Sequence, residues 1–164
     1  MTNKLRALLA DTPIALWCWV FPVTYLLHIA EEYYVADGYS AYLLKLRGVE
    51  LSPTRFLATQ SVGVVLMIAG ILLAKRFNFQ NTLVVILGAV VLVNGITHTV
   101  TSLADWHYEP GLVTSILIWI PIGVATLFHF KGRVSNRRFW LGIALGAAIN
   151  AAIAVFTMRG GRFV

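Results

Sequence analysis

The stretch NTLVVILGAVVLVNGITHTVTSL, at residues 81–103, decides the fold of this chain. It contains no Asp, Glu, Lys or Arg, and it is long enough for a helix to cross the ~30 Å hydrocarbon core of a bilayer, which takes about 20 residues. A helix also satisfies its own backbone hydrogen bonds, as lipid requires. The stretch therefore predicts a transmembrane helix.

Four further apolar runs of similar length stand at residues 13–35, 53–74, 111–130 and 139–158. Charged or turn-forming residues separate the five runs, at 45–50, 75–76, 105–111 and 131–138. Pro22 and Pro121 interrupt two of the runs, and each is expected to kink its helix and free one backbone carbonyl. There is no long linker and no clear repeat. We therefore expect one domain, residues 1–164, of the all-α class: a polytopic membrane protein built as a bundle of about five transmembrane helices.

The composition favours a membrane location over a soluble one. Of the 164 residues, 59% are hydrophobic and 12% are charged, whereas a soluble domain carries roughly 25% charged residues. The net charge of +6 comes from Lys and Arg beside the apolar runs, where they set orientation and touch anionic lipid. No nucleic-acid-binding motif is present. The one cysteine, Cys18, cannot form an intramolecular disulfide.

The positive charges of the loops predict an orientation. The first run follows two basic residues, as a signal peptide does, but no small-residue cleavage site follows it, so we expect a retained helix. With five spans, eight Lys and Arg residues fall on the N-terminal side and five on the opposite side. The eight are Lys4, Arg6, Lys75, Arg76, Lys131, Arg133, Arg137 and Arg138, and the five are Lys45, Arg47, Arg55, Arg159 and Arg162. The positive-inside rule predicts a multi-pass plasma-membrane protein with a cytoplasmic N-terminus and an external C-terminus.

Two of the predicted helices carry a stripe of polar residues near one end. The first run ends in TYLLHIAEE, residues 24–32, and at 100° per residue Glu31 and Glu32 flank His28 on one helix face. The third run ends with Asn94, His98 and further polar residues on one face. Ionisable groups inside a membrane span are costly, so the stripes indicate a functional site.

The two stripes are expected at the same depth in the membrane. Their runs cross in the same direction, and His28 and His98 both fall roughly 8–11 Å inside the boundary opposite the N-terminus. The second and fourth runs and the loop before the fourth add polar residues at that level, namely Thr59, Gln60, Ser61, Thr114, Ser115, Asp105, His107 and Glu109. We therefore expect His28 and His98 to approach one another.

Three sequence elements resemble a known family. HIAEE at 28–32, NGITH at 94–98 and YEPGLVT at 108–114 are similar to bacterial membrane proteins named for an HXXEE motif. The resemblance covers the first four apolar runs. It implies a small polytopic membrane protein and supports a site around His28, but it names no reaction.

The residue types favour a metal-dependent membrane enzyme. A His followed by a Glu three or four residues later can give one ion two ligands, and a facing helix can supply the rest. The candidate ligands form a mixed nitrogen and oxygen set that suits zinc or iron: His28, Glu31, Glu32, His98 and His107. We expect a divalent metal to assist hydrolysis, hydration or oxidation of a small hydrophobic, lipid-like substrate near the outer face.

The polar residues of the stripes are also assigned catalytic and supporting roles. The candidate catalytic residues are Glu31, Glu32 and Asn94. Asn94, Thr101 and Asp105 are also placed to orient ligands from behind. Two polar residues elsewhere are expected to have packing roles only: His129, near the N-terminal side, and Asn150, which suits an interhelical hydrogen bond.

Two other functions fit the same residues. In one, no metal binds, and Glu31 and Glu32 act as general acid and base on a sterol-like or isoprenoid lipid that is isomerised or cyclised. In the other, the protein is a proton-coupled transporter or a ligand sensor, although transporter sites usually lie at the midplane between repeated halves. An intramembrane glutamate protease is disfavoured, because Ala36 occupies the arginine position of its EExxxR pattern.

Overall fold

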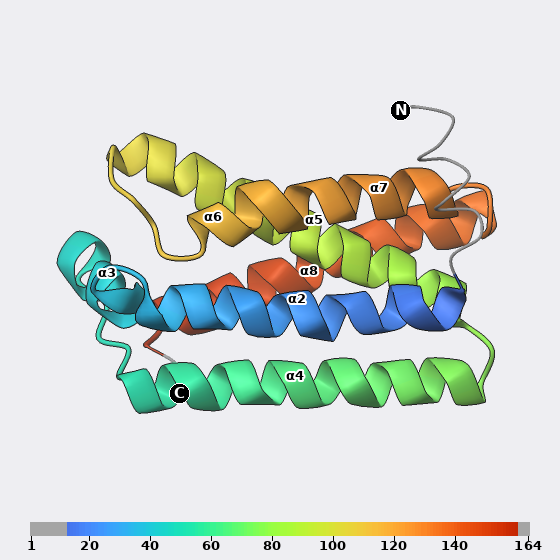
Figure 1. The fold of residues 1–164 in the computed structure, drawn as a ribbon, viewed down its shortest axis with the longest axis horizontal. Coiled ribbons are helices and arrows are strands. Elements are labelled where there is room, and N and C mark those ends of the chain that lie inside the picture. Colours follow the sequence, from blue (N-terminus) through green and yellow to red (C-terminus); the bar gives the residue numbers. More distant parts are fainter. Residues whose placement is uncertain (1–12, 161–164) are drawn as a thin grey trace.

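In the part of the chain that the structure describes, five long helices cross the bundle from end to end, and their arrangement can be followed in Figure 1. The structure, a computed structural model, describes residues 13–160. The helices that are long and apolar enough to span a membrane are Ile14–Tyr34 (α2), Pro53–Arg76 (α4), Gln80–Asp105 (α5), the composite span Leu112–Phe130 and Asn136–Met158 (α8). Within residues 13–160 there is no strand. The predicted all-α class with five spans is confirmed.

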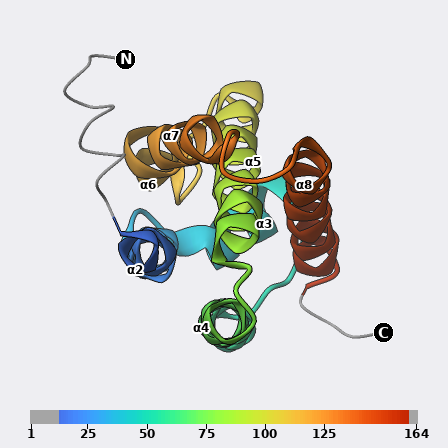
Figure 2. The same cartoon turned by 90° about the vertical axis from the view of Figure 1, so that its right-hand side faces the viewer.

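The central helix of the bundle is α5. It packs against α2, α4 and α8 and against the composite span, and Figure 2 shows these helices arranged around it. Close approach of α8 depends on Gly146, because a Cβ atom there would lie 2.6 Å from the Cβ atom of Ala89 on α5. Such small-residue contacts are typical of helix pairs in membranes.

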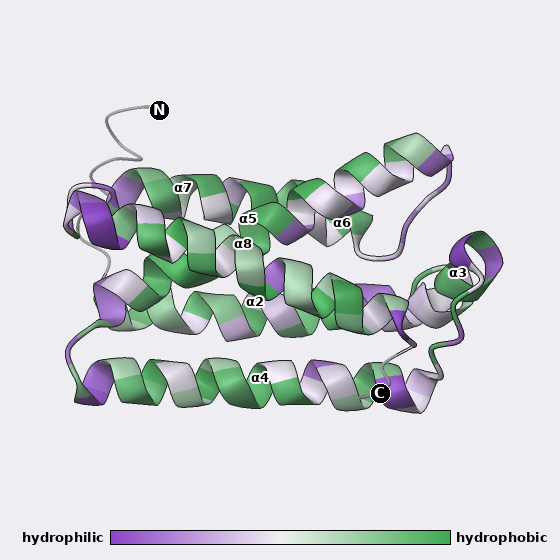
Figure 3. Ribbon diagram, turned by 180° about the vertical axis from the view of Figure 1, so that it is seen from behind, coloured by the Kyte–Doolittle hydropathy of each residue, from purple (hydrophilic) through white to green (hydrophobic). Residues whose placement is uncertain are grey.

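The outward faces of the helices are apolar. Figure 3 shows hydrophobic residues along α4 and α8, with hydrophilic residues gathered towards the helix ends. Val65, Leu66 and Leu72 of α4 are each more than half exposed. Soluble proteins rarely expose a continuous surface of this kind, so lipid is its natural solvent. The chain is therefore a multi-pass membrane protein. Three residues of the charge count, Lys4, Arg6 and Arg162, lie outside the described residues.

A short helix, Gly38–Arg47 (α3), follows the first span, in a segment where the apolar runs predict only a connection. It lies at the same end of the bundle as the loop between α5 and the composite span (Figure 1). The Tyr42 hydroxyl and the Arg47 guanidinium both donate to the Asp105 carboxylate, at 2.7 and 2.6 Å. These two bonds fasten α3 to the end of α5.

The composite span contains one wide turn. It consists of Leu112–Thr114 (α6), the π-helical segment Ser115–Trp119 (η1) and Ile120–Phe130 (α7). The N–H of Ile120 bonds the carbonyl of Ser115, five residues back. Pro121 has no N–H for the carbonyl four residues before it, so the irregularity expected near Pro121 takes this form. By contrast, α2 continues without a break through Pro22.

Candidate metal centre

His28 and His98 meet inside the bundle, as their equal depth predicts. Their ring centroids are 4.9 Å apart, with the rings nearly perpendicular. The exposed fraction is 1% for His28 and 4% for His98. The two rings are carried by α2 and α5, which run parallel. Because both rings are buried, neither faces lipid.

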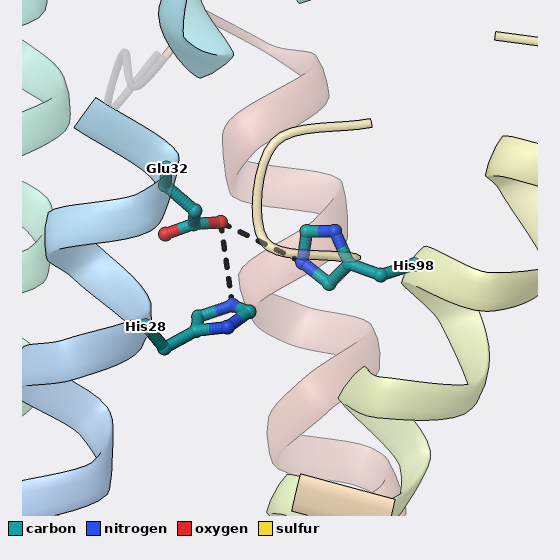
Figure 4. A group of neighbouring side chains, drawn as sticks. All are labelled: His28, Glu32 and His98. Carbon is teal, nitrogen blue, oxygen red and sulfur yellow. Dashed lines mark ion pairs between the residues drawn. The ribbon is translucent and has the colours of Figure 1, made fainter. Parts of the chain in front are cut away.

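Glu32 completes a three-residue group with the two histidines (Figure 4). One carboxylate oxygen, Oε1, lies 3.6 Å from Nε2 of His28 and 3.6 Å from Nε2 of His98. One ligand atom from each of the three residues lies within 4.8 Å of the other two, and all three residues are buried. The two distances of 3.6 Å are too long for good hydrogen bonds. They are close to the roughly 3.3 Å that separates two ligands of a tetrahedral ion with bonds of about 2.0 Å.

The other nitrogen of each imidazole, Nδ1, faces a polar side chain of its own. Nδ1 of His28 lies 2.7 Å from the Thr114 hydroxyl, and that hydroxyl donates its proton to the Gly111 carbonyl at 3.2 Å. The hydroxyl therefore accepts from Nδ1–H of His28. Nδ1 of His98 lies 3.2 Å from a carboxylate oxygen of Glu109, within ion-pair distance, although it makes no hydrogen bond of good geometry within residues 13–160. An ionised carboxylate can only accept, so Glu109 favours a proton on Nδ1 of His98. In neutral rings, both Nε2 atoms are then left as acceptors.

With both protons on Nδ1, three acceptor atoms converge: the two Nε2 atoms and Oε1 of Glu32. Nε2 of His28 has no hydrogen-bond partner among the described residues. Two imidazole lone pairs and a carboxylate oxygen repel one another at low dielectric unless a cation or a proton lies between them. The donor set, two imidazoles and one carboxylate, suits zinc or ferrous iron.

The Glu32 carboxylate is held by a short chain of hydrogen bonds. Its second oxygen accepts from Nε2 of Gln60 at 2.7 Å. The amide oxygen of Gln60 in turn accepts from the Tyr25 hydroxyl at 2.5 Å. Orienting partners of this kind usually stand behind the ligands of a metal site.

Glu31 faces a different part of the molecule. Its carboxylate accepts from the Tyr108 hydroxyl at 2.6 Å and from the backbone N–H groups of Val113 and Thr114, at 2.8 and 2.6 Å. Burial raises the pKa of the Tyr108 phenol, and its bond to Glu31 raises that pKa further, so the phenol remains a donor. The three donors bind both carboxylate oxygens of Glu31 and fasten α2 to the start of the composite span.

Glu109 stands behind His98. Besides its contact with Nδ1 of His98, the Glu109 carboxylate accepts a hydrogen bond from the Thr101 hydroxyl. Glu109 is 4% exposed. A carboxylate on the far nitrogen of a ligating histidine fixes the ring and raises its basicity. Thr101 thus contacts the Glu109 carboxylate rather than either imidazole ring.

Gly111 closes the group on the side of the loop. Its φ of +98° is one that glycine adopts readily. A Cβ atom at this position would lie 2.8 Å from Cε1 of His28, 3.0 Å from Cε1 of His98 and 3.2 Å from Cγ of Glu32. No side chain larger than hydrogen fits here without moving all three residues.

The remaining predicted residues lie outside the three-residue group. His107 is exposed, and its ring stacks near Tyr42 at a centroid distance of 6.4 Å. Asp105 binds α3 as described. Oδ1 of Asn94 is buried and has no hydrogen-bond partner within residues 13–160, and the same holds for Nδ2 of Asn150. His129 stacks on Trp17 at 5.5 Å, in the other half of the bundle.

Three contributors to the site cannot be placed beside His28 by helical periodicity. Trp119 stacks on His28 with a centroid distance of 3.7 Å, and Gly111 and Tyr108 approach through a loop whose path the apolar runs do not determine. The clue to Trp119 is its position near Pro121, which disturbs the helical register. Gln60, Thr114 and Glu109 are expected at this depth, but their individual partners are not.

The fold and the site define a class: a small multi-pass membrane protein with a buried His/Glu/His group near one end of its bundle. The model of a family described as a protein of unknown function with HXXEE motif matches residues 19–126, more than half of the chain, and the chain belongs to this family. The resemblance in the sequence is thereby confirmed. No curated protein and no solved structure matches the chain.

Proposed function

We propose that this protein is a membrane-embedded metalloenzyme whose metal is held by His28, Glu32 and His98. The observation that carries the proposal is the convergence of two Nε2 atoms on one carboxylate oxygen, each at 3.6 Å from it, with Nε2 of His28 buried and without a hydrogen-bond partner among the described residues. One divalent cation would satisfy all three acceptors. It would also keep the buried carboxylate ionised and the imidazoles neutral.

Three protein ligands leave a tetrahedral ion one open position, as in catalytic zinc sites. A bound zinc ion would activate water for hydrolysis or hydration, and ferrous iron on the same ligands would support oxidation. We propose a small lipid-like substrate, because the group is buried inside apolar spans, with Trp119 stacked on His28 and the Tyr39 ring 5.9 Å from the ring of His98. A compound dissolved in the bilayer reaches such a place without leaving lipid.

The metal-free acid-base alternative receives less support from the geometry. It needs Glu31 and Glu32 to act as a proton-handling pair. Glu31 already accepts three hydrogen bonds on the α6 side, whereas Glu32 faces the histidines. An acid-base reaction at this place would have to use Glu32 with His28 or His98.

The proposal is tested by turnover of native lipid with and without metal. Purified protein in nanodiscs of host lipid extract is incubated before and after chelation, and all lipids are compared by mass spectrometry. We expect one lipid species to be consumed by the native protein, to persist after chelation or in His98→Ala, and to be consumed by the control His129→Ala. Consumption that survives chelation but is lost in Glu32→Gln would overturn the metal mechanism in favour of acid-base chemistry.

A further inference from the structure

The wide turn of the composite span lies directly against the proposed metal centre. Residues Ser115–Trp119 form a π-helical segment, closed by the bond from the Ile120 N–H to the Ser115 carbonyl. Single π turns within α-helices occur frequently at functional sites. The expected disturbance from Pro121 explains why a turn can widen here, but not what the widening achieves.

The widening brings two residues five apart onto one ring. The Thr114 hydroxyl bonds Nδ1 of His28 at 2.7 Å, and the Trp119 indole stacks on the same imidazole at 3.7 Å with an interplanar angle of 24°. In a regular α-helix, residues five apart differ by about 140° in direction and could not both face one side chain. An i→i+5 turn places them on the same face.

The start of this segment is fixed by the same helix that carries His28. Glu31, three residues after His28, accepts from the backbone N–H of Thr114 at 2.6 Å. Thr114 is therefore held at two points by α2, through its backbone by Glu31 and through its hydroxyl by His28. Trp119 is 2% exposed and is itself backed by the ring of Tyr25, at a centroid distance of 6.1 Å.

We infer that the π turn is a positioning device for His28, with Thr114 and Trp119 as its two positioning residues. This inference rests on the proposed metal centre. Thr114 keeps the ring proton on Nδ1, so that the lone pair of Nε2 faces the centre. Trp119 fixes the plane of the ring, so that this lone pair points to the place where Glu32 and His98 also converge. The two glutamates of the HXXEE motif thereby have distinct roles, since Glu32 binds the metal and Glu31 holds the π turn.

Substitutions in the composite span distinguish a space-filling role from a positioning role. If the span served only to fill space, any apolar side chain of similar size would replace Trp119 or Thr114. If it positions His28, the hydroxyl and the aromatic ring matter individually. Thr114→Val and Trp119→Leu remove these features, whereas Thr114→Ser and Trp119→Phe preserve them. Trp140→Leu, on the exposed face of α8, is the matched control because Trp140 is 57% exposed.

The experiment measures Co²⁺ binding to the full-length protein in detergent by the visible absorption of the bound ion, which reports ligand number and geometry. We expect Thr114→Val and Trp119→Leu to weaken binding by about 10- to 100-fold, the usual effect of losing an orienting partner, and to alter the spectrum. Thr114→Ser, Trp119→Phe and Trp140→Leu should bind with the native affinity and spectrum.

Native affinity and spectrum in both Thr114→Val and Trp119→Leu would overturn the inference while leaving the metal centre intact. Failure of the native protein itself to bind Co²⁺ would instead overturn the proposed function, and the inference with it. As a check on folding, variants that lose affinity should elute as the native protein does in size-exclusion chromatography. Loss of affinity in the conservative pair, Thr114→Ser and Trp119→Phe, as severe as in the disruptive pair would also contradict the inference, since a general packing defect would then explain both.

Discussion

Glu31 and Glu32 are neighbours in the chain, yet their carboxylates share no hydrogen-bond or ion-pair partner within residues 13–160. Glu32 faces Nε2 of His28 and of His98, whereas Glu31 accepts from Tyr108 and from two backbone N–H groups of the composite span. A turn of 100° per residue is enough to direct one carboxylate to the centre and the other to the neighbouring helix.

The two glutamates should therefore respond differently to the same substitution. Glu32→Gln removes an anionic ligand, so we expect metal to be lost while the fold is kept. Glu31→Gln keeps all three proposed ligands, so it should lose far less metal than Glu32→Gln. It should lower the unfolding free energy by about 1–3 kcal/mol, because one of the buried donors is left without an acceptor. Metal content and thermal unfolding, measured on the same preparations, check both. Equal loss of metal in the two variants would contradict the division of roles.

Gly111→Ala should disturb the centre without removing a ligand. The added Cβ atom would press on both imidazoles and on Glu32, at 2.8, 3.0 and 3.2 Å, so we expect metal affinity to fall by about 10-fold or more. The matched control is Gly48→Ala. Gly48 also has a positive φ, +64°, but a Cβ atom there would meet no heavy atom within 4 Å.

Both alanine variants should lose about 1–3 kcal/mol of stability from the positive φ. Only Gly111→Ala should lose metal affinity in a Co²⁺ titration. If Gly48→Ala weakened binding as much, backbone strain rather than contact with the ligands would be the cause.

The predicted orientation places α3 and the α5–α6 loop outside the cell. Glu50, exposed between α3 and α4, and Gly132, in the exposed turn before α8, lie at opposite ends of the bundle. The native Cys18 is fully buried and should not react. In whole cells, a membrane-impermeant thiol reagent should label Glu50→Cys and should reach Gly132→Cys only after lysis. The opposite pattern would reverse the orientation.

Much of the fold follows from the sequence, because lipid leaves few choices. A run such as 81–103, free of charges, has to be a helix to satisfy its own backbone. The meeting of His28 and His98 also follows, since their depth is fixed by a constant rise per residue along parallel helices. The local sequence pattern and the crossing direction of each span are enough to predict both features.

Other features depend on information that a pattern does not contain. Both His107 and Glu109 are polar and lie in one loop, but only the path of that loop decides which of them turns inward. Glu109 reaches His98, while His107 stays exposed. The widened turn before Pro121 likewise changes which residues share a face, so Trp119 cannot be placed beside His28 by counting at 100° per residue.

The most direct test of the central claim is the metal content of the purified protein. Elemental analysis is done on protein prepared without chelator from cells supplied with zinc and iron, alongside His28→Ala, Glu32→Gln, His98→Ala and the control His129→Ala. We expect about one equivalent of a single transition metal per chain in the native protein and in the control, and well under one in the three ligand variants, because a lost ligand is not replaced in so closed a site. A native protein with well under one equivalent of any transition metal, or ligand variants that keep the native amount, would contradict the proposed centre.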